Sequence, residues 1–66
     1  MNQFYIKIKL HPWAHPAKAY RRMKRNMAIN GMNPFTLEIM GVVAENKIER
    51  IESVPEVLSV EILRNA

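Results

Sequence analysis

The absence of cysteine is the feature that most constrains this chain, because the chain has only 66 residues. Without cysteine there are no disulfides, no thiolate metal ligands and no thiol nucleophile. A domain of this size without such cross-links is close to the lower limit for independent folding. The apolar fraction of 48% is sufficient for one compact core and insufficient for two. We therefore expect residues 1–66 to form a single domain, either of low stability or stabilised by self-association.

The first residues predict a half-buried strand followed by a loop. Apolar and polar side chains alternate without interruption over residues 4–10, which is the pattern of a strand with one face in the core. Pro12 and Pro16 cannot donate hydrogen bonds to a sheet ladder, so the strand has to end before them. We expect residues 11–16 to form a connecting loop.

The next segment predicts a long amphipathic helix that begins at Pro16. Proline suits the first position of a helix, because its missing N–H group would have no partner there. Apolar side chains then recur at helical spacing as far as Met27. The Asn30-Gly31 pair is a typical helix stop, and Pro34 follows it. The helix is therefore expected to run from residue 16 to about residue 30.

Alternation resumes near Phe35 and continues through Val43, which predicts a second strand. The pattern weakens over residues 40–43, where Gly41 indicates a bulge, a bend or burial of both faces. One bent strand and two short strands therefore remain alternatives for residues 40–46.

A short second helix and a final strand are expected after this segment. Asn46 and Glu49 have the spacing of a capping box at the start of a helix over residues 47–54. Pro55 ends this helix, because the residue before a proline is pushed out of the helical region. Alternation over residues 57–63 then predicts the last strand.

The predicted order of elements is β-α-β-α-β, with a further strand near residues 41–45 as an alternative. Helices that join parallel neighbouring strands make right-handed crossovers, which puts both helices on one face of the sheet. The expected fold class is α+β: a small two-layer sandwich with two helices on one face of a sheet of three or four strands. This is a ferredoxin-like plan, β-α-β-(β)-α-β.

The C-terminal third, comprising residues 41–43 and 47–61, resembles the end of subtilisin-type propeptide and propeptide-like inhibitor domains. In that family a short helix, a proline and a valine precede a final strand with a Val-Glu pair, here Val60-Glu61. The resemblance implies an open ferredoxin-like sheet and inhibition of a protease through an extended C-terminal tail. Two features depart from the family pattern: the segment between the helices is short for the central hairpin, and the tail after Ile62 is brief.

Charge is unevenly distributed along the chain. Residues 1–33 contain seven Lys or Arg and no acidic residue, whereas residues 34–66 contain three Lys or Arg and six Glu. In the predicted first helix the basic side chains gather opposite the apolar face. The candidate binding residues are Lys18, Arg21, Arg22, Lys24 and Arg25, together with Trp13 in the preceding loop.

Three interpretations of this basic face are open. Lysine and arginine can follow a phosphate backbone, and Trp13 and Tyr20 would add stacking on bases. An acidic surface on a protein partner would satisfy the same charges. In the third interpretation the face is only solvated and pairs with Glu45, Glu49 and Glu52 of the second helix, where each exposed ion pair contributes about 0–1 kcal/mol.

A sheet of three or four strands has unpaired edges, and such an edge can accept a strand from a partner or from a second copy. Lys7 and Lys9 discourage pairing along the first strand, which makes the last strand the better candidate. Its expected strand-edge binding residues are Leu58, Ser59, Val60, Glu61, Ile62 and Leu63.

We expect no catalytic residues, no cofactor and no metal site. Asp is absent, and the two glycines do not form a phosphate-binding loop. His11 and His15 are four residues apart, as zinc ligands on one helix often are, but prolines interrupt this segment and no third ligand is near. The longest apolar run, residues 40–44, is too short to span a bilayer, and no signal peptide is apparent. A cytoplasmic location without membrane contact is therefore expected.

The leading hypothesis from the sequence is a small non-enzymatic module that binds a protein partner, as an inhibitor or regulator similar to protease propeptides. The alternative is a nucleic-acid-binding protein that uses the basic face of the first helix.

Overall fold

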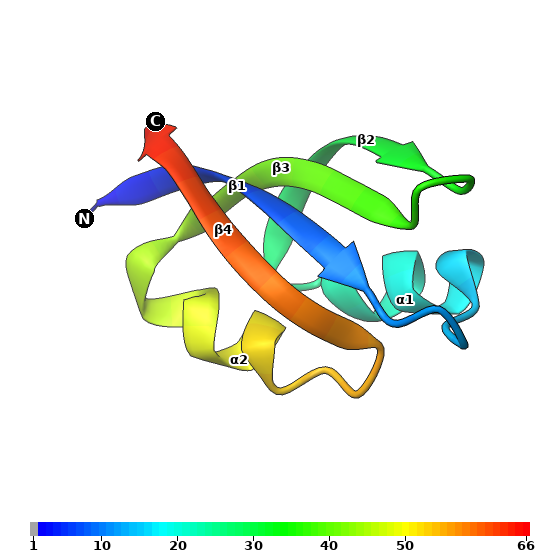
Figure 1. Cartoon of the computed structure of the whole chain (residues 1–66). Helices are drawn as coiled ribbons and strands as arrows, with labels where there is room; N and C mark the ends of the chain where they lie inside the picture. The colour runs from blue at the N-terminus through cyan, green and yellow to red at the C-terminus, as the bar shows by residue number, and fades with distance from the viewer. Residues whose placement is uncertain (1) are drawn as a thin grey trace.

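The computed structural model describes residues 2–66, which form four strands and two α-helices. Their order is β1 (Gln3–Leu10), α1 (Pro16–Met23), β2 (Met27–Asn33), β3 (Glu38–Ala44), a 3₁₀ turn η1 (Glu45–Lys47), α2 (Ile48–Glu52) and β4 (Val57–Asn65). Figure 1 shows their arrangement, and the expected α+β class is confirmed.

The four strands form one sheet in the order β2-β3-β1-β4, and every neighbouring pair is antiparallel. Helix α1 leads from β1 to β2, and α2 leads from β3 to β4. The expectation that helices join parallel neighbours is wrong, because another strand lies between the two strands that each helix connects. Strands β2 and β4 form the edges of the sheet, and β3 and β1 lie between them.

The predicted helix over residues 16–30 is wrong in its second half. Helix α1 ends at Met23, and the segment that follows forms the edge strand β2. Met27 is buried as a strand residue, so the apolar pattern that suggested a longer helix fits the strand equally well. As a strand, this segment gains a hydrogen-bonded partner in β3. Asn30-Gly31 marks a register shift in the β2–β3 pairing instead of a helix stop.

Strand β3 is one continuous strand that begins at Glu38, so the predicted start near Phe35 is too early. A turn precedes it, in which the Asn33 side-chain oxygen accepts hydrogen bonds from the N–H groups of Phe35 and Thr36 at 2.9 and 3.2 Å. Leu37 then adopts a positive φ of 58°. This turn leaves Phe35 at its tip with 95% of its surface exposed.

The second helix is shorter than residues 47–54 and is preceded by the 3₁₀ turn. Asn46 does not cap it, because neither the turn nor α2 has a side-chain cap hydrogen bond. Ile51 is fully buried, as its helical spacing predicts.

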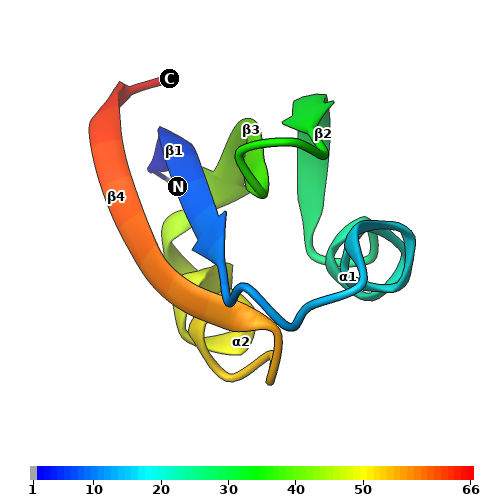
Figure 2. The ribbon, with the colours of Figure 1, turned by 45° about the vertical axis from the view of Figure 1, so that its right-hand side comes forward.

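Both helices lie on the same side of the curved sheet, with α2 beneath β1 and β4 and α1 beneath the start of β2 (Figure 2). The core fills the space between the two layers. Its fully buried large side chains are Ile6, Ile8, Leu10, Met23, Ile39, Val43 and Ile51. Across residues 2–66, we find no helix with the length and apolar content needed to cross a membrane.

Candidate nucleic-acid interface

Helix α1 separates its apolar and basic side chains onto opposite sides. Ala19 and Met23 are buried against the sheet, which anchors the helix. The predicted basic residues are all exposed on the outer side and in the turn that follows. We call this set the basic surface, and it consists of Lys18, Arg21, Arg22, Lys24 and Arg25.

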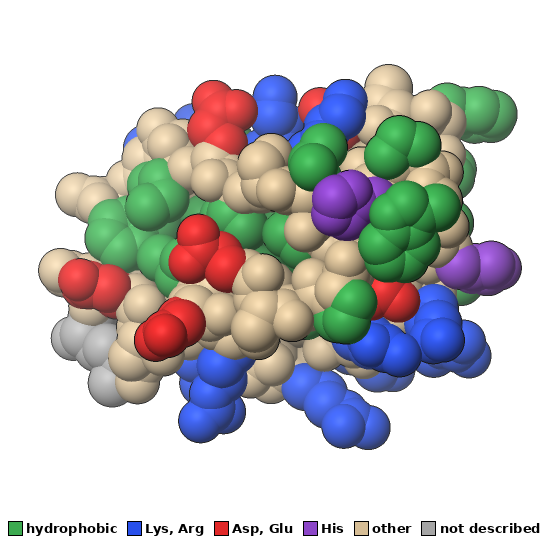
Figure 3. All heavy atoms as spheres, turned by 60° about the horizontal axis from the view of Figure 1, so that its bottom comes forward, with side chains coloured by type: hydrophobic (Ala, Val, Ile, Leu, Met, Phe, Trp, Pro, Cys, Tyr) green, Lys and Arg blue, Asp and Glu red, His purple; other side chains and the backbone are tan. Residues whose placement is uncertain are grey.

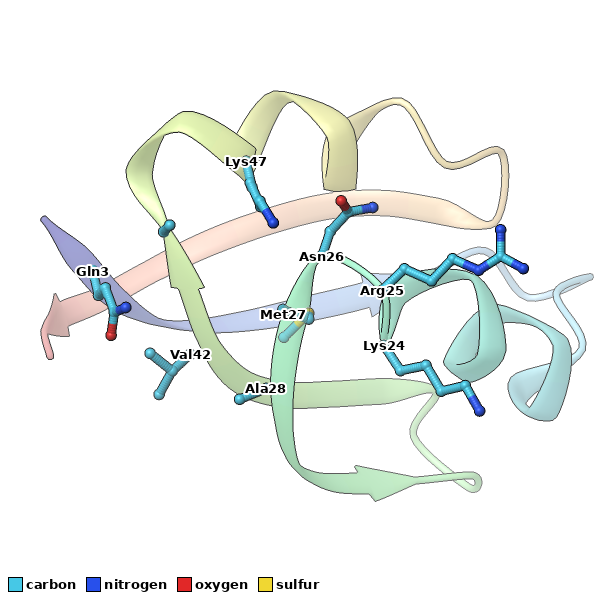
Figure 4. Close-up of a pocket in the computed structure, with 9 residues that line it drawn as sticks. Gln3, Lys24, Arg25, Asn26, Met27, Ala28, Val42 and Lys47 are labelled. Atoms are coloured by element: carbon cyan, nitrogen blue, oxygen red, sulfur yellow. The ribbon is translucent and has the colours of Figure 1, made fainter. Parts of the chain in front are cut away.

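The basic surface contains a shallow hollow of about 460 Å³. Four of the five basic residues line it together with Asn26, so the structure brings them to one place. A second hollow of about 330 Å³ lies where the turn after α1 meets the ends of β1, β2 and β3. Figure 4 shows Lys47 pointing from the η1–α2 segment toward Asn26, whereas the charged ends of Lys24 and Arg25 extend away from this hollow. Sequence reasoning missed Lys47, because nothing in its local context places it near the turn that follows α1.

The acidic partners expected from the second helix do not pair with this surface. Within residues 2–66, the basic surface makes one ion pair, between an Arg22 guanidinium nitrogen and Glu56 Oε1 at 3.7 Å. Glu56 is buried, with 5% of its surface exposed. Among residues 2–66, no group donates a hydrogen bond to its Oε1 atom. The other four basic side chains therefore have no carboxylate within ion-pair distance among the described residues, and their charges face solvent.

An aromatic pair lies next to the basic surface. Trp13 is 66% exposed, and its ring stacks on the His11 ring with a centroid distance of 5.2 Å and an interplanar angle of 14°. The His11 N–H group donates a hydrogen bond to the Glu56 carbonyl at 2.9 Å. Glu56 thus connects the aromatic pair to Arg22. In Figure 3, histidine and large hydrophobic side chains adjoin a group of basic side chains on one part of the surface.

The sheet face opposite the helices has a different charge pattern. Lys7 in the central strand lies between Glu38 of β3 and Glu61 of β4, at 3.8 and 3.7 Å. The Arg64 guanidinium lies 4.6 Å from the centre of the Tyr5 ring. Most charges on this face therefore have partners within the chain, which distinguishes it from the basic surface.

The predicted strand-edge residues 58–63 lie in β4, whose outer edge has no strand partner among the described residues. Leu58, Ile62 and Leu63 are each about half exposed, at 53%, 53% and 45%. The first strand, which was the other candidate edge, is paired on both sides and offers no edge. Its two partners are β3 and β4, and the local sequence pattern does not encode which strands become neighbours.

Neither His11 nor His15 belongs to a metal-ligand group. Within residues 2–66, there is no group of three His, Asp or Glu side chains that could hold an ion. Comparison of the chain with protein-family models, with curated proteins and with solved structures finds no match.

Proposed function

We propose that this protein binds nucleic acid through the basic surface of α1. The observation that most supports this is the set of four basic side chains without a carboxylate partner, close to the aromatic pair whose Trp13 ring is exposed. Unpartnered lysine and arginine side chains attract a polyanion, because binding releases the counterions condensed on its phosphates. Exposed aromatic rings next to such charges are typical of proteins that also contact bases.

Salt dependence tests this proposal directly. If the four unpartnered side chains each neutralise one phosphate, the slope of log K against log salt is about −2.8 for a single strand and about −3.6 for duplex DNA. For a single strand this corresponds to a loss of about 50-fold in affinity between 50 and 200 mM salt. A slope near zero, or no binding at low salt, would exclude the proposal.

Two double variants separate the effect of the basic surface from the effect of overall charge. The double variant Arg21→Gln/Arg25→Gln removes two unpartnered charges and should reduce the magnitude of the slope by about 1.4 for a single strand. The control variant Lys9→Gln/Arg50→Gln removes the same net charge from exposed positions outside the basic surface. Equal slopes for both variants would contradict a specific role for α1.

A protein partner that binds along β4 is the second candidate function. The observation that favours it is the unpaired edge with three half-exposed apolar side chains, since such edges accept an additional strand. Light scattering after size exclusion tests the version in which the partner is a second copy. A dimer or complex that the wild type forms and the variant Leu58→Glu/Ile62→Glu does not form supports this function. Equal complex formation by both proteins contradicts it.

The protease-inhibitor version of this second candidate concerns the C-terminal tail. Leu63, Arg64 and Asn65 belong to β4, and the Ala66 N–H group donates a hydrogen bond to the Gln3 carbonyl at 2.8 Å. Deletion of residues 63–66 would therefore also shorten a strand. An inhibition assay with the variant Leu58→Glu/Ile62→Glu is more informative than this deletion, because the variant keeps the full length of β4. No inhibition of a subtilisin-type protease by the wild type would exclude this version.

We also propose that the fold is ferredoxin-like. The support is the chain order β-α-β-β-α-β together with two β-α-β connections that each enclose a strand from the other connection. Superposition of an experimental structure of this chain on domains known to have the ferredoxin-like fold would test the assignment.

A further inference from the structure

We propose that the nucleic acid bound by the basic surface is single-stranded, and that one of its unpaired bases stacks on Trp13. This inference rests on the proposed function and specifies its ligand. It is carried by the geometry of the Trp13–His11 pair and by the contacts that connect this pair to α1.

The first step concerns the free surface of Trp13. His11 covers one face of the indole ring at an offset-stacked distance. The side chain nevertheless keeps 66% of its surface exposed, so its other face is open. A large aromatic ring with one supported face and one open face is a stacking platform for a flat apolar surface such as a base.

The second step concerns how firmly this platform is held. The backbone of His11 is anchored at two points: its N–H group bonds to the Glu56 carbonyl and its carbonyl accepts a bond from Ala14, each at 2.9 Å. Ala14 is itself buried, and residue 16 begins α1. The platform is therefore held between the start of α1 and the segment that precedes β4.

The third step concerns the contacts that link the aromatic pair to the basic surface. Glu56 contacts both His11, through its backbone, and Arg22, through its side chain. The aromatic pair consequently lies one residue away from the hollow that Arg22 and three other basic residues line. Phosphates held in this hollow would therefore be separated from the aromatic pair by Glu56 and Arg22.

The fourth step distinguishes single strands from duplexes. Base faces in a duplex are covered by their neighbours, so a base can stack on Trp13 only after it leaves the duplex. An unpaired strand already exposes these faces and pays no such cost. The platform therefore favours a single strand, whereas the charges of the basic surface would act on both forms.

Trp13 is the only tryptophan in the chain, so intrinsic tryptophan fluorescence reports on this platform alone. We would titrate the full chain with oligo(dT), with the same strand annealed to oligo(dA), and with inorganic polyphosphate. Oligo(dT) should bind more tightly than the duplex and should quench the fluorescence at saturation. Polyphosphate, which has charge without bases, should bind with little quenching.

The variant Trp13→Ala should weaken oligo(dT) binding by about 5- to 150-fold, the range measured for loss of one base–aromatic stack, without changing the salt slope. Trp13→Phe should restore part of this affinity. Phe35→Ala is the matched control, because Phe35 is also an exposed aromatic residue but lies at the tip of the β2–β3 turn. It should leave binding unchanged, and circular dichroism of each variant checks that it folds.

Several results would overturn this inference. Equal affinity for oligo(dT) and the duplex, unchanged fluorescence at saturation, or equal effects of Trp13→Ala and Phe35→Ala would each do so while leaving nucleic-acid binding intact. If none of the three probes binds at low salt, the proposed function is overturned as well.

Discussion

Gly41 occupies a position in β3 where even one additional methyl group has no space. It lies in the middle of the sheet, opposite Ile6 of β1 and Ile29 of β2. A Cβ atom at this position would collide with the Ala28 carbonyl oxygen, and it would lie 2.7 Å from the Met27 methyl carbon and 3.0 Å from the Ile29 Cα atom. Two of these three contacts are backbone atoms of β2, which cannot move away by changing a rotamer.

We therefore predict that Gly41→Ala strongly destabilises the protein. Overpacking of a core costs about 1–3 kcal/mol, and a collision with backbone falls at the upper end of that range. A domain of this length has a total stability of about 3–10 kcal/mol. Because 1 kcal/mol shifts the melting temperature of a domain this small by about 4–8 °C, a loss of about 3 kcal/mol corresponds to about 12–24 °C.

Thermal and urea unfolding followed by circular dichroism measure this effect. Gly31→Ala is the matched control, since a Cβ atom there has nothing within 4 Å and neither glycine has a positive φ. The control should be neutral or more stable by about 0.4–1 kcal/mol, because alanine restricts the unfolded chain. Equal melting temperatures for the two variants would refute the close approach of β2 and β3 at Gly41.

Three further predictions concern the core, the turn and the basic surface. Ile51→Ala should cost about 2–5 kcal/mol in urea unfolding because Ile51 is fully buried, whereas Ile62→Ala at the exposed edge should cost less than about 1 kcal/mol. Asn33→Ala should cost about 1 kcal/mol, because the side chain accepts two backbone hydrogen bonds, and Phe35→Ser should be neutral; equal effects would contradict the turn. Glu56→Gln releases Arg22 from its ion pair and should increase the magnitude of the salt slope by about 0.7, whereas Glu52→Gln should leave the slope unchanged.

Local patterns in the sequence were sufficient to predict those helices and strands whose periodicity fits only one type of element. The alternation of residues 4–10 predicted β1, and Pro55 separated the second helix from β4, because both signals act through neighbouring residues. The region around Met27 was different, since its apolar residues fit a helix and a strand equally well. Only the pairing with β3, in which Met27 lies opposite Val43, favoured the strand there, and a local pattern does not show this pairing.

The same division applies to the candidate site. Helical spacing alone placed the basic side chains of α1 opposite its buried face, because residues that are three and four positions apart share a side of a helix. Tertiary structure decided which of these charges have partners: it brought Glu56 to Arg22, left Glu45, Glu49 and Glu52 unpaired with α1, and stacked His11 on Trp13. These contacts join residues far apart in the chain or depend on a loop conformation, and no local pattern encodes either.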